Sequence, residues 1–409
     1  MVVAAFVAPY LLEATARFVH VAASLPDVRL GLITCEPLEA VSPELRQQLA
    51  GHWRVDDALD PRQIAAAVAG LHQQMGRVDR LVGALEQLQV PLAQVREGIG
   101  VPGMNVQTAL NVRDKSRMKE ALEAAGVPCA RHALVRSRIE AMGFADQVGF
   151  PLVAKPPAGA GAQATYRLDD ADMLMRWLAA APLTEHSPAL LEEFLTGEEH
   201  SYDSVSIDGS TVWSSISDYS PPPLEVLRNP WIQWTVMLPR DITVPQYDGI
   251  HHWGPLALQA LGVRDALTHM EWFRRPDGSV AISEVAARPP GAQLTSMHGY
   301  AHDFDLYRAW AELVVHGRFQ PPARQYATGT AYLRGMGRGR VRTVHGVDAV
   351  QQQIGRLVVE ARLPQPGQPA ASDYLGEGYV IVRDKDTEVV KDALQRIVTG
   401  VRVELAESR

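Results

Sequence analysis

The segment 269–292 constrains the fold more than any other part of the sequence. It reads His-Met-Glu-Trp-Phe-Arg-Arg-Pro-Asp-Gly-Ser-Val-Ala-Ile-Ser-Glu-Val-Ala-Ala-Arg-Pro-Pro-Gly-Ala. An Asp-Gly pair between alternating apolar segments is a strong signal for a β-hairpin. If Asp277 and Gly278 form a two-residue loop, Glu271 faces Glu284 across the ribbon. The sequence therefore predicts two carboxylates on one side of a hairpin.

The register of this hairpin depends on its turn. A two-residue loop also pairs Phe273 with Ile282. A three-residue turn that begins at Pro276 is the alternative, and it shifts the register by one residue through a bulge. The two glutamates remain neighbours in either arrangement.

Opposed carboxylates in a hairpin need a partner of opposite charge. Directly paired strand residues have Cβ atoms about 4.5–5.5 Å apart, and like charges there destabilise the pair. A cation between Glu271 and Glu284 removes that cost. Arg288 lies four residues beyond Glu284 and keeps its strand parity, so it points to the same side. Two acids and an arginine on one face indicate a site for a divalent metal and phosphate.

Composition limits the class of protein. A chain of 409 residues is long for one core, and two or three domains are expected. The net charge of −8 gives no global basic field for nucleic acid. Cys35 and Cys129 are far apart and match no disulfide framework or metal motif. The N-terminus lacks the basic region of a signal peptide, and no apolar run is long enough to span a membrane, so we expect a cytoplasmic protein.

The first 110 residues alternate between strand and helix patterns. Apolar runs at 2–8, 28–34 and 78–83 predict strands, and segments 11–24 and 61–76 have helical patterns. This alternation predicts a small parallel α/β unit. No GxGxxG follows the first strand, so dinucleotide binding there is not expected.

Two lysines are candidate phosphate ligands. Lys155 ends an apolar strand and is followed at once by a Pro/Ala/Gly loop that contains Gly159 and Gly161. Small residues let backbone N–H groups approach an anion, and lysine supplies a point charge. The alternative is a flexible turn with a solvated lysine. Lys115 lies near the start of a predicted helix, where an ordinary first-turn charge is the favoured interpretation of that residue alone.

Three further segments complete the organisation. Residues 190–209 predict strand, turn and strand, with consecutive acids at Glu192 and Glu193. Residues 218–240 are rich in proline and tryptophan and indicate a long loop, for which a substrate-side wall is favoured over a surface segment. The C-terminal part, after a helix within 302–316, ends in a strand–helix–strand pattern from 378 onward.

The ordered set of these motifs resembles the ATP-grasp superfamily of carboxylate–amine ligases. The resemblance runs from about Asp114 to Gly291 and is most similar to the L-amino acid ligases within the biotin-carboxylase-like branch. It implies an α/β (α+β) fold with a Rossmann-like N-terminal domain at 1–110, an ATP-grasp domain at 111–317 and a small C-terminal subdomain at 318–409. A lid is expected at about 130–190.

The resemblance also implies a role for each matching residue. Lys115 and Lys155 would contact the α- and β-phosphates of ATP, and the loop 158–162 would close over the triphosphate. Glu192 would accept from the adenine amino group, and Glu193 and Leu195 would meet the ring through their backbones.

The remaining roles concern the ribose, the metal and the acyl group. Glu199 would hold the ribose hydroxyls, Glu271 and Glu284 would ligate Mg²⁺ (with Mn²⁺ as a substitute), and Arg288 would stabilise the acyl-phosphate. The family often has an asparagine where this chain has Ala286, so the geometry of a second metal is open.

The function expected from this resemblance is ATP-dependent amide-bond formation between amino-acid-like substrates, with ADP as product. Its partners would be small-molecule carboxylates and amines, and a homodimer is allowed. A ligase or transformylase of purine biosynthesis is the alternative in the same superfamily. A kinase or a non-catalytic ATP-binding protein is the alternative from another class. His269 and His298 are candidates for a general base, although a lone histidine is more often structural.

Overall fold

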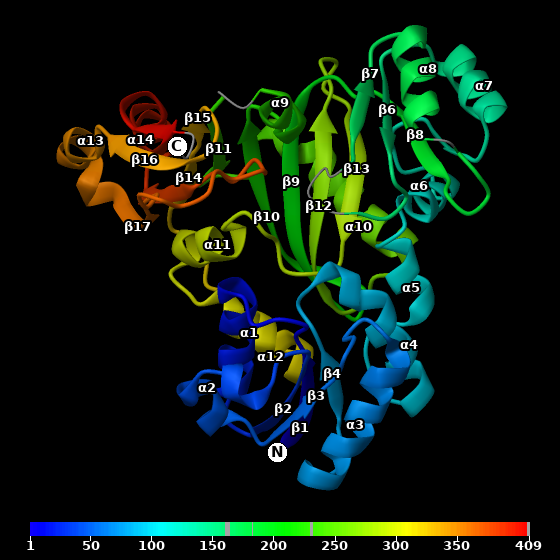
Figure 1. The fold of residues 1–409 in the computed structure, drawn as a ribbon, viewed down its shortest axis with the longest axis vertical. Helices are drawn as coiled ribbons and strands as arrows, with labels where there is room; N and C mark the ends of the chain where they lie inside the picture. The colour runs from blue at the N-terminus through cyan, green and yellow to red at the C-terminus, as the bar shows by residue number, and fades with distance from the viewer. Residues whose placement is uncertain (160–163, 182, 230–231, 407–409) are drawn as a thin grey trace.

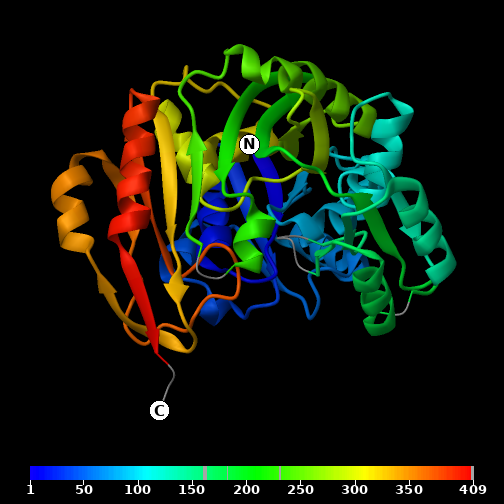
Figure 2. The ribbon, with the colours of Figure 1, turned by 90° about the horizontal axis from the view of Figure 1, so that it is seen from above.

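The computed structural model describes residues 1–406 except 160–163, 182 and 230–231. Within these residues four sheets form: an N-terminal sheet, a central sheet, a small sheet and a C-terminal sheet (Figure 1). In the view of Figure 2, the helices of the small sheet and the C-terminal elements lie on opposite sides of the central strands. None of the helices described is long and apolar enough to cross a bilayer.

The N-terminal sheet is parallel and has the order β3-β2-β1-β4. Its strands are β1 (Val2–Val7), β2 (Val28–Thr34), β3 (Gly51–Arg54) and β4 (Arg80–Val82), and the helices around them are α1 (Glu13–Ala23), α2 (Pro43–Gln48), α3 (Pro61–Met75) and α4 (Gln89–Ile99). Ala4 and Phe6 face one hydrophobic cluster and Ala5 and Val7 face another, because successive side chains point to opposite faces. The predicted parallel α/β unit is confirmed, although the sequence did not indicate β3.

The central sheet is antiparallel, with the order β13-β12-β9-β10-β11-β14-β18-β17. Its strands are β9 (Glu198–Ile207), β10 (Ser210–Ser220), β11 (Trp234–Leu238), β12 (Ala266–Arg274), β13 (Val280–Ala286), β14 (Ala327–Leu333), β17 (Val358–Arg362) and β18 (Gly378–Asp384). The helices that follow or precede them are α9 (Pro223–Arg228), α10 (Asp248–Leu261), α11 (Leu294–His302), α12 (Leu306–His316), α13 (Val347–Ile354) and α14 (Thr387–Gly400). The predicted glutamate hairpin, β12–β13, is at one edge of this sheet.

The two other sheets are shorter. The small sheet has the order β5-β8-β6-β7 and is antiparallel, and the C-terminal sheet has the order β15-β19-β16. Their strands are β5 (His132–Val135), β6 (Leu152–Lys155), β7 (Tyr166–Leu168), β8 (Ala189–Glu193), β15 (Gly335–Met336), β16 (Arg340–His345) and β19 (Arg402–Ala406). Helices α7 (Arg138–Val148) and α8 (Ala171–Ala180) pack on the small sheet, and α5 (Val106–Asn111) and α6 (Lys115–Ala124) connect it to the N-terminal sheet. The predicted strand–turn–strand at 190–209 is confirmed as β8 and β9.

The hairpin combines features of both predicted registers. Glu271 pairs with Glu284, as the two-residue loop requires, but Phe273 pairs with Ala281 rather than with Ile282. The turn has three residues, 276–278, and Gly278 adopts the positive φ of 83° that such a turn favours. A bulge at Ser283 then adds one residue and restores the pairing of the glutamates. The two-residue loop was therefore wrong, and the bulge is what keeps the carboxylates opposed.

The segment 218–240 is more regular than the sequence indicated. Residues 218–220 complete β10, α9 follows, and Trp234 lies inside β11 of the central sheet. The prediction of a long loop was wrong over most of this length because the proline and tryptophan content concealed an apolar strand. Trp231 lies outside the described residues.

His302 makes stability depend on pH. The side chain is buried on α11, and its Nδ1 lies 2.7 Å from the carbonyl oxygen of Pro322. Burial, opposed in part by that hydrogen bond, lowers the pKa of His302 to about 4. Between pH 7 and pH 5 the unfolded chain therefore takes up a proton that the folded chain does not, and stability falls as pH falls. We expect His302→Phe to remove roughly 2 kcal/mol of that pH-dependent loss, measured by urea unfolding at both pH values; an unchanged pH dependence would contradict this.

Candidate active site

The predicted site residues converge on one pocket between the small sheet and the hairpin of the central sheet. The pocket contains all ten predicted site residues that the structure describes: Lys115, Lys155, Gly159, Glu192, Glu193, Leu195, Glu199, Glu271, Glu284 and Arg288. Gly161 and the rest of the segment 160–162 lie outside the described residues. The convergence joins β6 and β8 to β9, β12 and β13, which are far apart in the sequence.

Two buried lysines surround the carboxylate of Glu192. Lys155 Nζ lies 3.0 Å from Glu192 Oε2, and Lys119 Nζ lies 3.3 Å from Glu192 Oε1. The second contact has the distance of an ion pair but not the geometry of a hydrogen bond. Burial raises the pKa of Glu192, but the two lysines outweigh it and the net pKa is lowered. Burial likewise opposes the charge of Lys155, and Glu192, Glu284 and Glu271 raise its pKa.

Lys119 is a site residue that sequence reasoning missed. It is fully buried, and its Nζ also donates to the carbonyl of the bulge residue Ser283 at 3.2 Å. It lies four residues after Lys115, so the two lysines share one face of α6. That spacing was a signal, but the segment matched a solvent-exposed helix equally well.

The segment after β8 can receive a flat ring. Val153, Phe194, Leu195 and Phe273 supply apolar atoms to this end of the pocket. The carboxylate of Glu193 turns away from it, because Arg131 Nε donates to that group at 2.7 Å. This leaves the backbone of the segment, rather than the Glu193 side chain, for contact with a ligand.

The start of α6 places Lys115 against the loop after β6. Asp114 caps the helix by accepting from the N–H groups of Ser116 and Arg117, so Lys115 occupies the first helical position. The Lys115 N–H donates to Pro157 O at 2.8 Å, and its Nζ donates to Gly159 O at 3.0 Å. The described part of the glycine loop is therefore fastened directly to the helix-borne lysine.

Three carboxylates meet at the hairpin. Lys115 Nζ lies 2.9 Å from Glu284 Oε1, which offsets the charge of one member of the opposed pair. Burial raises the pKa of Glu271, but His269, Lys115 and Arg288 outweigh burial and lower it. Burial and the negative charges of Glu271 and Glu284 raise the pKa of Glu199 well above its usual range, against the opposing effect of Lys155. The raised pKa of Glu199 reflects the negative charge that Glu271 and Glu284 place beside it, and two adjacent carboxylates of this kind suit a bound divalent metal.

The carboxylates fit magnesium in their chemistry. Mg²⁺ binds one or two protein carboxylates and completes its shell with phosphate oxygens and water. Among the residues described, no group of three His, Cys, Asp or Glu side chains is placed to hold a metal alone. Glu271 and Glu284 therefore match a metal that is shared with a nucleotide rather than a site made wholly of protein ligands.

Arg288 is held from the N-terminal sheet. Its Nε donates to Glu86 Oε2 at 3.2 Å, and the other oxygen of Glu86 accepts from Arg113. Glu86 follows β4 at the start of a short 3₁₀ helix (Glu86–Leu88) and is buried. Arg113 also donates to Gly159 O at 3.2 Å. Glu86 was not predicted, because nothing near it in the sequence marks a site.

Removal of the Glu86 carboxylate should affect turnover more than nucleotide binding. In Glu86→Gln the Arg288 guanidinium loses the ionic partner that fixes its direction, and misplacement by about 1 Å can lower a rate about 100-fold. We expect kcat to fall at least about tenfold with KM for ATP nearly unchanged, measured by ADP release. Glu44→Gln, on the exposed surface of α2, is the control. Equal losses in kcat and in ATP affinity would contradict a role through Arg288.

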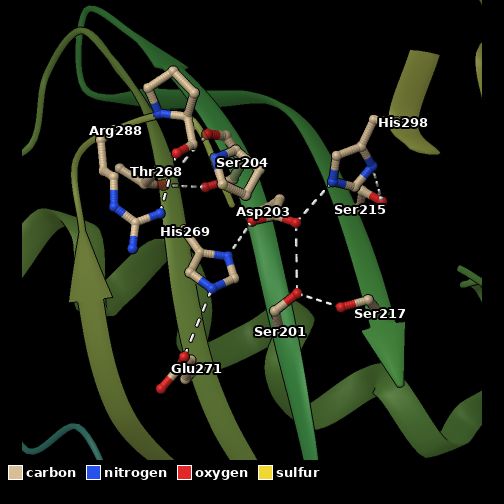
Figure 3. A network of polar contacts seen from close by, with 12 residues as sticks. Ser201, Asp203, Ser204, Ser215, Ser217, Thr268, His269, Glu271, Arg288 and His298 are labelled. Carbon is tan, nitrogen blue, oxygen red and sulfur yellow. Dashed lines mark hydrogen bonds and ion pairs between the residues drawn. The ribbon is translucent and has the colours of Figure 1, made fainter. Parts of the chain in front are cut away.

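A buried polar network lies behind Glu271 (Figure 3). Asp203 on β9 contacts His269 Nδ1 at 2.6 Å and His298 Nε2 at 2.7 Å. His269 Nε2 in turn lies 3.8 Å from Glu271 Oε1. Burial opposes charge on His269, but Asp203 outweighs it and raises the pKa of His269 to about 9. His269 is thus not an isolated histidine.

The donors and acceptors in this network can be assigned from Arg324, which lies at the end away from Glu271. Arg324 can only donate, so Ser215 Oγ accepts from Arg324 and its own hydroxyl proton points to His298 Nδ1, 3.1 Å away. His298 therefore donates from Nε2 to Asp203, and burial lowers the pKa of His298, as expected for a neutral ring. Both nitrogens of His298 are engaged, which excludes it as a base toward the pocket. Of the two histidine candidates, His269 alone lines the pocket.

Comparison with known proteins agrees with this arrangement. No family model matches the chain. It is 25% identical over 278 residues to the L-arginine-specific L-amino acid ligase of Bacillus subtilis, and the match covers 66% of each protein, so the chain spans about two thirds of that relative.

Two solved structures cover nearly the whole chain. The L-amino acid ligase from Bacillus licheniformis superposes with a TM-score of 0.78 at 16% identity and covers 100% of this chain and 99% of its own. The biotin carboxylase domain of the Hydrogenobacter thermophilus 2-oxoglutarate carboxylase, solved with MgADP, ADP and bicarbonate, has a TM-score of 0.69 at 15% identity and covers 98% and 90%. The expected fold is confirmed: the chain has the α/β fold of solved ATP-grasp proteins, and its sequence is similar to that of an L-amino acid ligase.

Proposed function

We propose that this protein is an ATP-dependent carboxylate–amine ligase that forms an amide or peptide bond between amino-acid-like substrates and releases ADP. The convergence of Lys115, Lys155, Glu271, Glu284 and Arg288 on one pocket carries the proposal. The similarity to an L-amino acid ligase supports it. A purine-biosynthesis ligase is not favoured, because the sequence relatives include an L-arginine-specific L-amino acid ligase and an alanine–anticapsin ligase.

The pocket lining offers suitable groups for each part of ATP. The apolar end at Phe194 and Phe273 would take the adenine, and Leu195 and Glu193 would meet its edge through their backbones. Glu199, whose raised pKa favours a protonated carboxyl, would bond the ribose hydroxyls. These positions put the triphosphate toward the hairpin and the two lysines.

Glu271 and Glu284 would hold Mg²⁺, for which Mn²⁺ is a substitute, and Ala286 supplies no third ligand. Bound there, the metal would neutralise phosphate charge and orient the γ-phosphate. His269 lies behind Glu271, with its Nε2 3.8 Å from that carboxylate, and its charge would favour the ionised form of Glu271.

The reaction would proceed in two displacements. A substrate carboxylate oxygen attacks the γ-phosphorus, the bond to the bridging oxygen breaks, and ADP leaves with an acyl-phosphate formed. Lys115 and Lys155 stabilise the charge that develops on the phosphates. The amine nitrogen then attacks the acyl carbon, phosphate leaves, and the nitrogen loses its proton. Arg288 can bind the phosphoryl or carboxylate oxygens with two parallel donors.

Substrate-dependent ADP release tests the proposal. An amino acid pair with ATP and Mg²⁺ should give ADP, phosphate and a product of the mass of the amide, and omission of the amine should suppress full turnover. ADP formation with a hydroxyl substrate alone would instead indicate a kinase. ATP binding without any turnover over a panel of amino acid pairs would indicate a non-catalytic ATP-binding protein. We place the protein in the cytoplasm, consistent with two cysteines that are free in the structure.

A further inference from the structure

Part of the lining of the pocket that contains Arg288 is aromatic and apolar. Six side chains form it, and we call them the aromatic wall: Tyr219, Pro223, Leu224, Trp234, Leu294 and Tyr374. They come from β10, α9, β11, α11 and the segment between β17 and β18. None of them belongs to the motifs from which the ATP site was predicted.

Packing behind the wall makes its shape rigid. Trp234 is 1% exposed, and its ring stacks on Tyr332 with centroids 4.6 Å apart. Tyr374 meets the edge of the same indole at 4.8 Å, and Tyr219 meets it at 5.7 Å. These rings and Leu294 belong to one hydrophobic cluster of the central sheet. A well-packed cluster resists rearrangement, so the wall presents a fixed apolar surface.

The wall lies next to the reaction centre. Burial and the carboxylate of Glu271 raise the pKa of Tyr374 to about 12, against the opposing charge of Arg288. Burial and the same carboxylate also raise the pKa of Tyr219. Both phenols line the same pocket as Glu271 and Arg288, which puts the wall beside the glutamate that would ligate the metal. A substrate whose carboxylate meets Arg288 would extend toward these rings.

The wall offers no counter-ion to a charged side chain. Among the described residues that line the pocket, the ionisable groups other than the tyrosines are the lysines, the glutamates, Arg288 and His269. All of these belong to the part of the site proposed for the nucleotide, the metal and the acyl group. A guanidinium or carboxylate buried against the wall would lose its hydration without gaining a counter-ion. An apolar side chain would instead gain from burial.

We infer that the substrate whose carboxylate is activated is an amino acid with a large apolar or aromatic side chain, which packs on the aromatic wall while Arg288 binds its carboxylate. This rests on the ligase function proposed above. It distinguishes the chain from its L-arginine-specific relative. It also makes the wall residues the determinants of specificity.

Hydroxylamine in place of the amine substrate isolates the choice of acid, because it captures an acyl-phosphate as a hydroxamate. With ATP and Mg²⁺, we expect phenylalanine, leucine or methionine to give hydroxamate with kcat/KM at least tenfold above that of arginine or glutamate. Calorimetric titration of phenylalanine and of arginine into the protein with ADP and Mg²⁺ gives a second readout that does not require turnover.

A matched pair of variants tests the wall itself. Leu224→Glu adds a carboxylate to the wall and should raise the ratio of arginine to phenylalanine in kcat/KM at least tenfold. Leu227→Glu makes the same change on α9 at a half-buried residue outside the pocket lining and should leave the ratio unchanged. Tyr374→Phe should retain the wild-type preference, because it keeps the ring.

The outcomes separate the inference from the ligase proposal. Hydroxamate formed preferentially from arginine or glutamate would overturn the inference and leave the ligase intact. Selective binding of phenylalanine without any hydroxamate would support the wall as a site for an apolar side chain and overturn the ligase. An arginine-to-phenylalanine ratio that moves equally in Leu224→Glu and Leu227→Glu would overturn the role of the wall.

Discussion

Glu284→Ala should lower ADP release at least about 100-fold while the protein stays folded. Glu284 faces Glu271 across the hairpin and pairs with Lys115 at 2.9 Å, so its loss removes half of the carboxylate pair that would hold the metal. The stability cost should be small, because the side chain is 22% exposed in an edge strand. ADP release at saturating ATP and Mg²⁺, with circular dichroism as a check on folding, gives the two measurements.

The control for this variant is Glu198→Ala. Glu198 is in β9 of the same sheet, its side chain is 64% exposed, and it does not line the pocket. Activity within about twofold of the wild type is expected there. Near-normal activity in Glu284→Ala would refute the metal assignment, and a loss of folded signal would show that Glu284 is structural instead.

Most of the predicted site residues were identified from short sequence patterns. The Asp-Gly turn with its flanking apolar residues was sufficient to predict a hairpin that makes Glu271 and Glu284 neighbours, because hairpin pairing is set within a few residues. Their direct opposition depends on the bulge. The bulge at Ser283 was not visible in that pattern, since a bulge depends on contacts from outside the hairpin. One such contact is Lys119, which donates to the Ser283 carbonyl.

Long-range partners account for what the sequence could not show. Glu86 is 202 residues from Arg288, and His298 is 95 residues from Asp203. Each is an ordinary polar residue in its own segment, and only the packing of distant elements brings it to its partner. The aromatic wall is a mixed case. Four of its six residues lie in the segment 218–240, for which the sequence indicated a substrate-side wall, whereas Tyr374 comes from a segment between two C-terminal strands that carries no motif.

The roles of individual ligands remain predictions even where the residues converge. Glu192 is the clearest example. The family resemblance makes it an acceptor for adenine, whereas the structure places its carboxylate between Lys119 and Lys155. The two roles predict different effects of removing the Glu192 charge on the stability of the nucleotide-free protein.

Glu192→Gln should destabilise the protein by about 3–5 kcal/mol, because it leaves Lys119 and Lys155 buried without their carboxylate. Glu193→Gln, one residue further along the same strand, is the matched control. Glu193 pairs with Arg131, whose side chain is 59% exposed, so its loss should cost no more than about 1 kcal/mol. Urea unfolding of the nucleotide-free protein measures both costs, and unequal m-values would show that the compared states have changed.

The double variant Glu192→Gln with Lys119→Met decides the physical cause. Methionine fills much of the volume of the lysine chain without its charge, so one unpaired buried charge disappears and part of the lost stability should return. Recovery of at least about 1 kcal/mol relative to Glu192→Gln alone would identify the Lys119–Glu192 ion pair as the source of the cost. Unchanged stability in Glu192→Gln, together with weakened ATP binding, would instead assign Glu192 to the adenine and leave the two lysines stabilised by the remaining glutamates and the Ser283 carbonyl.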